Sequence, residues 1–326
     1  MQRRKFIRLF GGFAATFPLA ARARIAARKA RLGMLIPFPQ DDTEGQKRVA
    51  TVRRELERLG WAEGRNLEIV YRWATSDIQR AAVEMTQLQP DVILTIATPP
   101  AAALQQATGT LPIVFVMVAD PVAAGLVSSL QKPGGNLTGF QNLDYGMSTK
   151  WLELLKEIAP HVARVGVVRD PTVSSNVAQY AAVQSVSRSF QVELTPLGGR
   201  DPDELERAVV EFARTPNSGL ICAASPFTNN HRERIISLAA RHRMPAVYPF
   251  RYFVAQGGLC SYGPDVLNFF RQAASYVDRI LKGERPADLP VQTATKYELA
   301  VNLKTAKAID IMVPTSLLTR ADEVVE

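Results

Sequence analysis

Four short polar residues each stand directly before a proline at the end of an apolar run: Thr98, Asp120, Asp170 and Ser225. Residues of this type cap helices, because the side chain accepts hydrogen bonds from the free N–H groups of the first turn. Proline at the first helical position loses nothing, since the N–H that it lacks has no partner there. The pattern predicts a helix start at each position, and a helix start attracts anionic or acceptor-rich groups.

The four capping residues differ in the ligand groups that they suit. Thr98 and Ser225, with free N–H groups beside them, suit a carboxylate, whereas Asp120 and Asp170 suit an ammonium or a polyhydroxyl group. A zwitterion such as an amino acid satisfies both kinds. Aromatic residues near the same positions could enclose a flat or apolar ligand body; they are Phe38, Phe227, Tyr248, Phe250 and Tyr252. The alternative is that the four residues only cap helices and bind no ligand.

The apolar runs that precede these residues are rich in β-branched side chains and alternate with segments of helical period. After the first run, Val49, Val52, Leu56 and Leu59 recur at spacings of three and four, which indicates an amphipathic helix. This alternation predicts parallel βαβ units. The expected strands span 32–36, 67–73, 92–97, 113–118, 137–140, 164–168, 192–196, 219–224, 246–248, 259–262 and 297–302.

The βαβ pattern stops near 139–146, where Asn, Asp and Gly accumulate, and then restarts. We therefore expect an α/β fold of two Rossmann-like lobes with parallel sheets, joined by a multi-strand hinge. The expected division is 31–141 with 259–290 for lobe 1, and 142–258 with 291–326 for lobe 2. Open parallel sheets bind ligands at the carboxyl ends of their strands, so the capping residues of both halves would line one cleft if the lobes face each other.

Residues 1–30 are predicted to be an export signal and a linker. Nine of the 39 Lys and Arg residues lie in the first 31 positions, which contain no acidic residue. The paired arginines Arg3 and Arg4, the 13-residue apolar run at 9–21 and the small residues after it match a twin-arginine signal. The run is too short to span a bilayer. The alternative is a basic arm that binds nucleic acid or anionic lipid.

The rest of the sequence excludes several other kinds of chemistry. Beyond residue 31 the chain carries 30 basic and 31 acidic residues, so its body has no net attraction to nucleic acid. Phosphate-binding glycine loops and His-Glu-x-x-His spacing are absent, and the nearest match to a nucleophile elbow, 259–263, lacks its first glycine. Cys222 and Cys260 either pair as a disulfide or fill apolar space. We expect no catalysis, no cofactor and no metal.

Several segments together resemble the substrate-binding proteins of ABC transporters, in the branch of the type I periplasmic-binding fold that is linked to uptake of tryptophan or related amino acids. The resemblance covers nearly the whole chain. The segments that carry it are Arg3-Arg4-Lys5-Phe6-Ile7, Glu57-Arg58-Leu59-Gly60-Trp61 with Gly64-Arg65-Asn66, Pro112-Ile113-Val114-Phe115 with Asp120-Pro121-Val122, Pro133-Gly134-Gly135-Asn136-Leu137-Thr138-Gly139-Phe140, Trp151-Leu152-Glu153-Leu154-Leu155-Lys156, Tyr262-Gly263-Pro264-Asp265 and Asn302-Leu303-Lys304-Thr305-Ala306.

This resemblance implies two lobes that close over a small solute without a reaction and deliver it to an ABC permease in the inner membrane. It implies a periplasmic protein, exported through the twin-arginine signal; we expect a monomer with no nucleic-acid partner. The ligand-binding residues are then expected to be Phe38, Thr98, Asp120, Asn142, Asp170, Ser225, Tyr248 and Tyr262. These residues do not fix the identity of the ligand.

Other functions could use the same two-lobed architecture. A ligand-sensing module would dock on a membrane receptor instead of a permease. A hydrolase would use Ser261 or Asp120 for its chemistry. A cytoplasmic repressor core is disfavoured, because no helix-turn-helix precedes the first expected strand.

Overall fold

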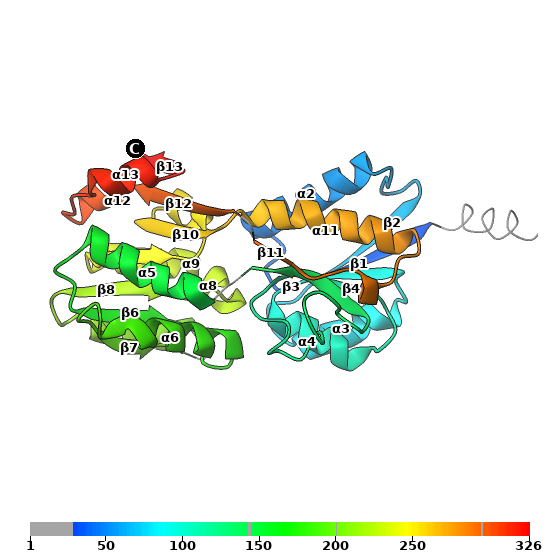
Figure 1. Ribbon diagram of the computed structural model, residues 1–326, viewed down its shortest axis with the longest axis horizontal. Coiled ribbons are helices and arrows are strands. Elements are labelled where there is room, and N and C mark those ends of the chain that lie inside the picture. The colour runs from blue at the N-terminus through cyan, green and yellow to red at the C-terminus, as the bar shows by residue number, and fades with distance from the viewer. Residues whose placement is uncertain (1–28, 143–144, 200, 295) are drawn as a thin grey trace, which may run out of the picture.

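The computed structural model describes residues 29–142, 145–199, 201–294 and 296–326, and it has two α/β lobes (Figure 1). The expected α/β fold with two sheets of mainly parallel strands is confirmed. The predicted export signal at 1–30 lies outside the described residues except for its last two positions, and the first strand already begins at Ala30. No helix in the described part of the chain combines the length and the apolar character that crossing a bilayer requires.

Lobe 1 contains a six-stranded sheet whose strands all run parallel. Its order is β11 (Gln292–Thr293), β5 (Leu137–Gln141), β4 (Ile113–Val118), β3 (Val92–Ile96), β1 (Ala30–Ile36) and β2 (Leu67–Trp73). One face packs against α2 (Thr43–Arg58) and α11 (Val266–Leu281), and the other against α3 (Ile78–Gln87) and α4 (Thr98–Ala107). Side chains along a strand point alternately to the two faces of the sheet. Met34 therefore packs in the hydrophobic cluster on the α2 and α11 face, and Leu35 in the cluster on the α3 and α4 face.

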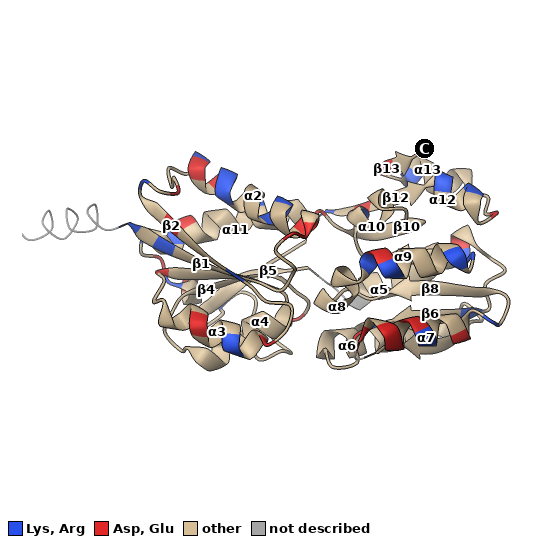
Figure 2. Cartoon of the chain, turned by 180° about the vertical axis from the view of Figure 1, so that it is seen from behind, with Lys and Arg blue, Asp and Glu red and all other residues tan. Residues whose placement is uncertain are grey.

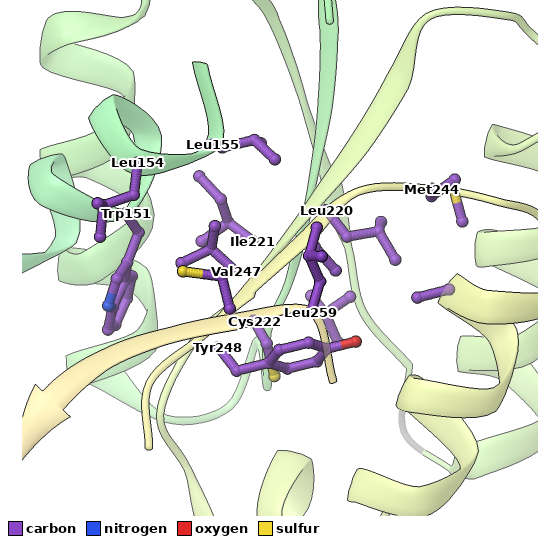
Figure 3. Packing of buried hydrophobic residues seen from close by; sticks show 14 of the residues in the cluster. Trp151, Leu154, Leu155, Leu220, Ile221, Cys222, Met244, Val247, Tyr248 and Leu259 are labelled. Atoms are coloured by element: carbon purple, nitrogen blue, oxygen red, sulfur yellow. The ribbon is translucent and has the colours of Figure 1, made fainter. Parts of the chain in front are cut away.

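Lobe 2 contains a seven-stranded sheet in which only β10 and β12 pair antiparallel. Its order is β13 (Glu323–Val325), β12 (Tyr297–Asn302), β10 (Cys260–Pro264), β9 (Ala246–Tyr248), β8 (Ser218–Cys222), β6 (Arg164–Val168) and β7 (Glu193–Leu197). The other elements are α5 (Tyr145–Ile158), α6 (Ser174–Ser187), α7 (Pro202–Phe212), α8 (Pro226–Asn230), α9 (Arg232–Arg241), α10 (Arg251–Ala255), α12 (Leu303–Ala308), α13 (Thr315–Arg320) and, in lobe 1, the 3₁₀ turn η1 (Pro286–Asp288). Figure 3 shows Trp151 and Leu155 of α5 beside Ile221 and Val247 in the core.

The chain crosses between the lobes after β5, after β10 and after β11. The sequence places 259–290 in lobe 1, but β10 pairs with β9 and β12, so this strand belongs to the sheet of lobe 2. The sequence also places 291–326 in lobe 2, whereas β11 pairs with β5 in lobe 1. The reason for both differences is that a short strand carries no local signal for the sheet that it joins.

Gly139 allows β4 and β5 to approach closely in lobe 1. A Cβ atom at this position would lie 1.9 Å from the carbonyl oxygen of Phe115, its partner residue on β4. A side-chain rotation cannot relieve an overlap with the backbone. Only glycine therefore fits at this position.

We expect Gly139→Ala to lower the free energy of unfolding by about 2 to 3 kcal/mol, because the backbone of a packed core must shift to admit the methyl group. Chemical denaturation measures the change. Gly109→Ala is the matched control, since a Cβ at Gly109 meets no atom within 4 Å. Equal stability of the two variants would contradict the close approach of the strands.

Candidate functional site

A cavity lies between the two lobes, beyond the carboxyl ends of several strands. In Figure 1, β1 runs inward from the outer end of lobe 1, and α8, which follows β8, lies near the centre of the molecule. About 40 Å³ of the cavity can hold the centres of water molecules, and the space free of protein atoms is about 460 Å³ when open solvent at its mouth is counted. From lobe 1 and the first crossing it is lined by Phe38, Arg48, Ile96, Ala97, Thr98, Pro99, Met117, Ala119 and Asn142. From lobe 2 it is lined by Val173, Ser175, Ala224, Ser225, Pro226, Asn229, Phe250 and Tyr252.

Four of the eight residues predicted from the sequence line this cavity: Phe38, Thr98, Asn142 and Ser225. Ser225 is the side-chain N-cap of α8, as predicted, and its Oγ accepts a hydrogen bond from the N–H of Thr228 at 3.1 Å. Thr98 is instead the first residue of α4, and Ala97 occupies the N-cap position without a side-chain hydrogen bond. The hydroxyl of Thr98 is therefore not used in capping.

Asp120 and Asp170 do not line the cavity, and neither begins a helix. Asp120 Oδ1 accepts the N–H of Ala123 at 2.9 Å in a turn. Asp170 Oδ1 accepts the N–H of Thr172 at 2.9 Å and its hydroxyl at 2.6 Å, and α6 starts only at Ser174. The prediction of helix starts was wrong here because an aspartate before a proline caps a turn as readily as a helix.

Tyr248 and Tyr262 also lie away from the cavity lining. Tyr248 is buried in the core of lobe 2, where its ring stacks on Phe253 with the centroids 5.1 Å apart; Figure 3 shows it beside Leu259. Tyr262 stacks on Tyr297 of the neighbouring strand at 5.7 Å. Both rings stabilise the sheet of lobe 2.

Arg48 is one of the residues in the cavity lining that sequence analysis missed, together with Asn229. Its side chain is 1% exposed, and none of its three guanidinium nitrogens has a hydrogen-bond partner among the described residues. Its Cζ lies 4.6 Å from the ring centroid of Phe38, 5.4 Å from that of Tyr252 and 6.0 Å from that of Phe270. Cation–π contacts of this kind contribute about 0.5 to 2 kcal/mol each, and together they offset part of the several kcal/mol that burying an unpaired ion costs. Arg48 forms no ion pair among the described residues, although the buried carboxylate of Glu44 lies one helical turn earlier on α2 and acts on the same tyrosine, Tyr252.

The helical period of α2 contains the signal for Arg48. Val52 and Leu56 follow it at i+4 and i+8, and both are fully buried. Residues at these spacings share one helix face. An arginine on the apolar face of an amphipathic helix is therefore a candidate for a buried ligand contact.

Two asparagines extend the set of unsatisfied polar groups in the cavity. Asn142 Oδ1 and Asn229 Nδ2 are buried and have no hydrogen-bond partner among the described residues. Asn229 Oδ1 accepts a hydrogen bond from the hydroxyl of Tyr252. Burial raises the pKa of Tyr252, although the nearby charge of Arg48 opposes the rise, so its hydroxyl stays protonated. The cavity thus offers a cation, a neutral donor and a neutral acceptor.

Two buried amides of α6 hold the wall of the cavity in lobe 2. Gln179 Oε1 accepts the N–H of Ala224 at 2.9 Å, and Asn176 Nδ2 donates to the carbonyl oxygen of Ala224 at 2.8 Å. Asn176 Oδ1 also accepts the N–H of Asp170 at 2.8 Å. Both main-chain groups of Ala224 are therefore fixed directly before the cap of α8.

Two strained residues stand at the carboxyl ends of β3 and β4. Ala97 has φ 71° and ψ 167°, a backbone region that is almost reserved for glycine, and Met117 has φ 61°. The register between β4 and β5 shifts between Val116 and Val118, which marks a bulge at Met117. Both strained residues line the cavity.

The two residues that the sequence offers to a hydrolase, Ser261 and Asp120, lie outside the cavity lining. Ser261, the candidate nucleophile of a hydrolase, is fully buried in β10 and lies outside the lining. Cys222 and Cys260 are free, and burial raises the pKa of each thiol to about 12, so both stay protonated. No group of three or more residues that could hold a metal ion occurs within the described ranges. Two α/β lobes around a cavity with buried, unsatisfied polar groups define a solute-binding protein of the type I periplasmic-binding fold.

Comparison with known families agrees with this class. A model described as "ABC transporter substrate binding protein" matches residues 43–325. The chain belongs to this family, as the sequence resemblance indicates.

Three proteins illustrate the similarity. A tyrosine-binding protein of Clostridioides difficile (strain R20291) is 28% identical over 267 residues, which are 79% of this chain and 75% of that protein. An ABC domain in complex with L-Trp from Streptococcus pneumonia has a TM-score of 0.84 at 22% identity, covering 91% of this chain and 100% of that one. The ligand-free, open structure of a substrate-binding protein with adhesive properties from Clostridium difficile has a TM-score of 0.65 at 24% identity, covering 91% and 99%.

We expect Ala97→Gly to raise the free energy of unfolding by about 1 kcal/mol. The strain at this residue costs about 1 to 3 kcal/mol, and the greater freedom of glycine in the unfolded chain offsets part of the gain. Ala102→Gly, inside α4, serves as the control and is expected to lower stability by about 1 kcal/mol. A loss of stability in both variants would contradict strain at Ala97.

Proposed function

We propose that the protein captures an α-amino acid with an apolar or aromatic side chain between its lobes and delivers it to an ABC permease. The observation that carries this proposal is Arg48, whose buried guanidinium lines the cavity without a hydrogen-bond partner among the described residues. Arginine holds a carboxylate through two parallel hydrogen bonds. A ligand carboxylate would supply both the missing counter-charge and the missing acceptors.

Neutral groups are available for the other polar atoms of such a ligand. Asn142 Oδ1 is a buried acceptor that suits an ammonium group, and the hydroxyls of Thr98 and Ser225 line the same cavity. Asn229 Nδ2 is a buried donor that suits the carboxylate. These residues take the place of Asp120 and Asp170, to which the sequence assigned the ammonium.

The rest of the lining favours an apolar ligand body. Ile96, Pro99, Met117 and Phe250 contribute apolar surface to the cavity. Tyrosine and L-Trp, the ligands in the names of two similar proteins, have side chains of this kind. An aromatic amino acid is therefore the ligand that we would test first.

Closure of the lobes supports capture as the mechanism. The lobes touch in this structure, where Asn230 Nδ2 donates to the carbonyl oxygen of Pro37 at 3.3 Å. The TM-score is higher for the L-Trp complex, 0.84, than for the ligand-free, open structure, 0.65. A ligand that contacts both lobes binds the closed form better than the open form, and this difference in affinity drives closure.

Export and delivery complete the proposal. The basic, apolar N-terminal segment would direct the chain through the twin-arginine route into the periplasm. There, a monomer with a filled cleft would present the solute to a permease in the inner membrane.

We expect L-tryptophan, L-tyrosine or L-phenylalanine to raise the melting temperature. A ligand at 100 times its dissociation constant adds about 2.7 kcal/mol to the free energy of unfolding. Tryptamine, which lacks the carboxylate, should give no shift, because nothing then pairs with Arg48. Differential scanning fluorimetry with all twenty amino acids and this amine measures the effect. Equal shifts with tryptamine and L-tryptophan would contradict carboxylate recognition.

We expect Arg48→Met to weaken amino-acid binding by about 30-fold or more, since a charge-assisted pair contributes about 2 to 5 kcal/mol when its partner is buried. The ligand-free variant should be at least as stable as the wild type, because it buries no unpaired charge. Isothermal titration calorimetry and denaturation measure the two effects. Arg164→Met is the control, because Arg164 also lies over an aromatic ring, Phe212 at 4.9 Å, but outside the cavity lining.

A further inference from the structure

A buried ion pair joins the two lobes beside the cavity. Asp42 precedes α2 in lobe 1, and Arg232 is the first residue of α9 in lobe 2. Arg232 Nη1 lies 2.6 Å from Asp42 Oδ2, and the two side chains are only 7% and 5% exposed. Figure 2 shows acidic residues at the end of α2 that faces lobe 2. Most ion pairs of the described residues lie on solvated surfaces and contribute little, whereas this pair is desolvated.

Each partner of the pair is also held by its own lobe. Asp42 Oδ1 caps α2 by accepting the N–H of Gly45 at 2.6 Å. Arg232 Nε donates to Gln256 Oε1 at 2.9 Å, and Nη1 donates to the carbonyl oxygen of Asn229 at 3.0 Å. Opening of the lobes would break the bond between Asp42 and Arg232 and leave these other bonds intact. Both side chains are therefore already oriented before the lobes close.

The pair is connected to the residues that we assign to the ligand. Asp42 caps the helix that carries Arg48, and Arg232 bonds to the backbone of Asn229. Neither Asp42 nor Arg232 lines the cavity. An effect of this pair on ligand affinity is therefore indirect: it passes through the equilibrium between open and closed lobes or through the positions of Arg48 and Asn229.

We propose that Asp42 and Arg232 form a latch that holds the lobes closed and slows release of the ligand. The proposal rests on solute capture in the cleft, as argued above. Removing one partner leaves the other charge buried without a counter-charge in the closed form but hydrated in the open form. The single substitutions therefore destabilise the closed form selectively, and the two are positioning residues, not ligand contacts.

Asp42→Asn is the sharpest variant, because asparagine caps a helix as well as aspartate does but carries no charge. We expect Asp42→Asn and Arg232→Gln each to raise the release rate of L-tryptophan or L-tyrosine about 10- to 100-fold, with a much smaller change in the association rate. The double variant should lose less than the product of the two single effects, because neither charge is then left alone. Stopped-flow fluorescence measures both rates.

Asp201→Asn is the matched control. Asp201 caps α7 through the N–H groups of Asp203 and Glu204, and the same substitution there removes a charge from an exposed cap in lobe 2. We expect wild-type release rates for this variant. Two outcomes would overturn the proposed latch. One is an equal change of the release rate in Asp42→Asn and Asp201→Asn; the other is a double variant whose effect is the product of the two single effects.

A second measurement tests the latch without any ligand. Fluorophores on Leu59→Cys in lobe 1 and Met312→Cys in lobe 2 report the distance between the lobes, since these side chains are 40% and 90% exposed. The natural cysteines are fully buried and stay unlabelled. We expect Asp42→Asn and Arg232→Gln to shift the ligand-free distance distribution toward the open form. Unchanged distributions would overturn the latch, whereas a shift in a protein that binds no amino acid would support the latch and refute the proposed ligand.

Discussion

An unpaired guanidinium in the space between the lobes is the constraint on which the site depends. Folding encloses Arg48 among three aromatic rings, and its three guanidinium nitrogens find no hydrogen-bond partner among the described residues, although the hydroxyl of Tyr252 lies close enough to interact with them. The rings compensate only part of the lost hydration. The empty, closed form therefore carries a free-energy cost that an anion can remove, and a solute with a carboxylate couples its own binding to the closing of the lobes.

The framework around this charge is rigid because local main-chain groups are satisfied by buried side chains. Gln179 and Asn176 fix Ala224 from one lobe, and the bulge at Met117 and the strained Ala97 form the wall of the other. Strain of this kind persists only where the surrounding structure determines the conformation. Of the polar groups left over, Asn229 Nδ2 is also fixed in direction, because Oδ1 of the same amide accepts a hydrogen bond from Tyr252.

The periodicity of the sequence predicts the architecture well and the site only in part. Strands such as Leu67–Trp73 and Tyr297–Asn302 have the predicted bounds, because an apolar run between polar turns has few alternatives. The assignment of β10 to lobe 1 was wrong, since its pairing with β9 and β12 depends on residues far away in the chain. Ser225 was confirmed as a cap, but Asp120 begins a turn that looks the same in sequence. The hydrophobic periodicity of α2 places Arg48 on the buried side of the helix, but it does not reveal which residues Arg48 contacts there.

Lobe 1 is assembled from distant parts of the chain, and this affects its synthesis on the ribosome. The strands β1 to β5 are complete at Gln141, yet the face of the sheet that contains Met34 packs against α11, which ends only at Leu281. Throughout translation of most of lobe 2, the nascent chain must carry this apolar face partly uncovered. Aggregation is favoured while such surface is exposed, so this interval is when a chaperone would be needed most.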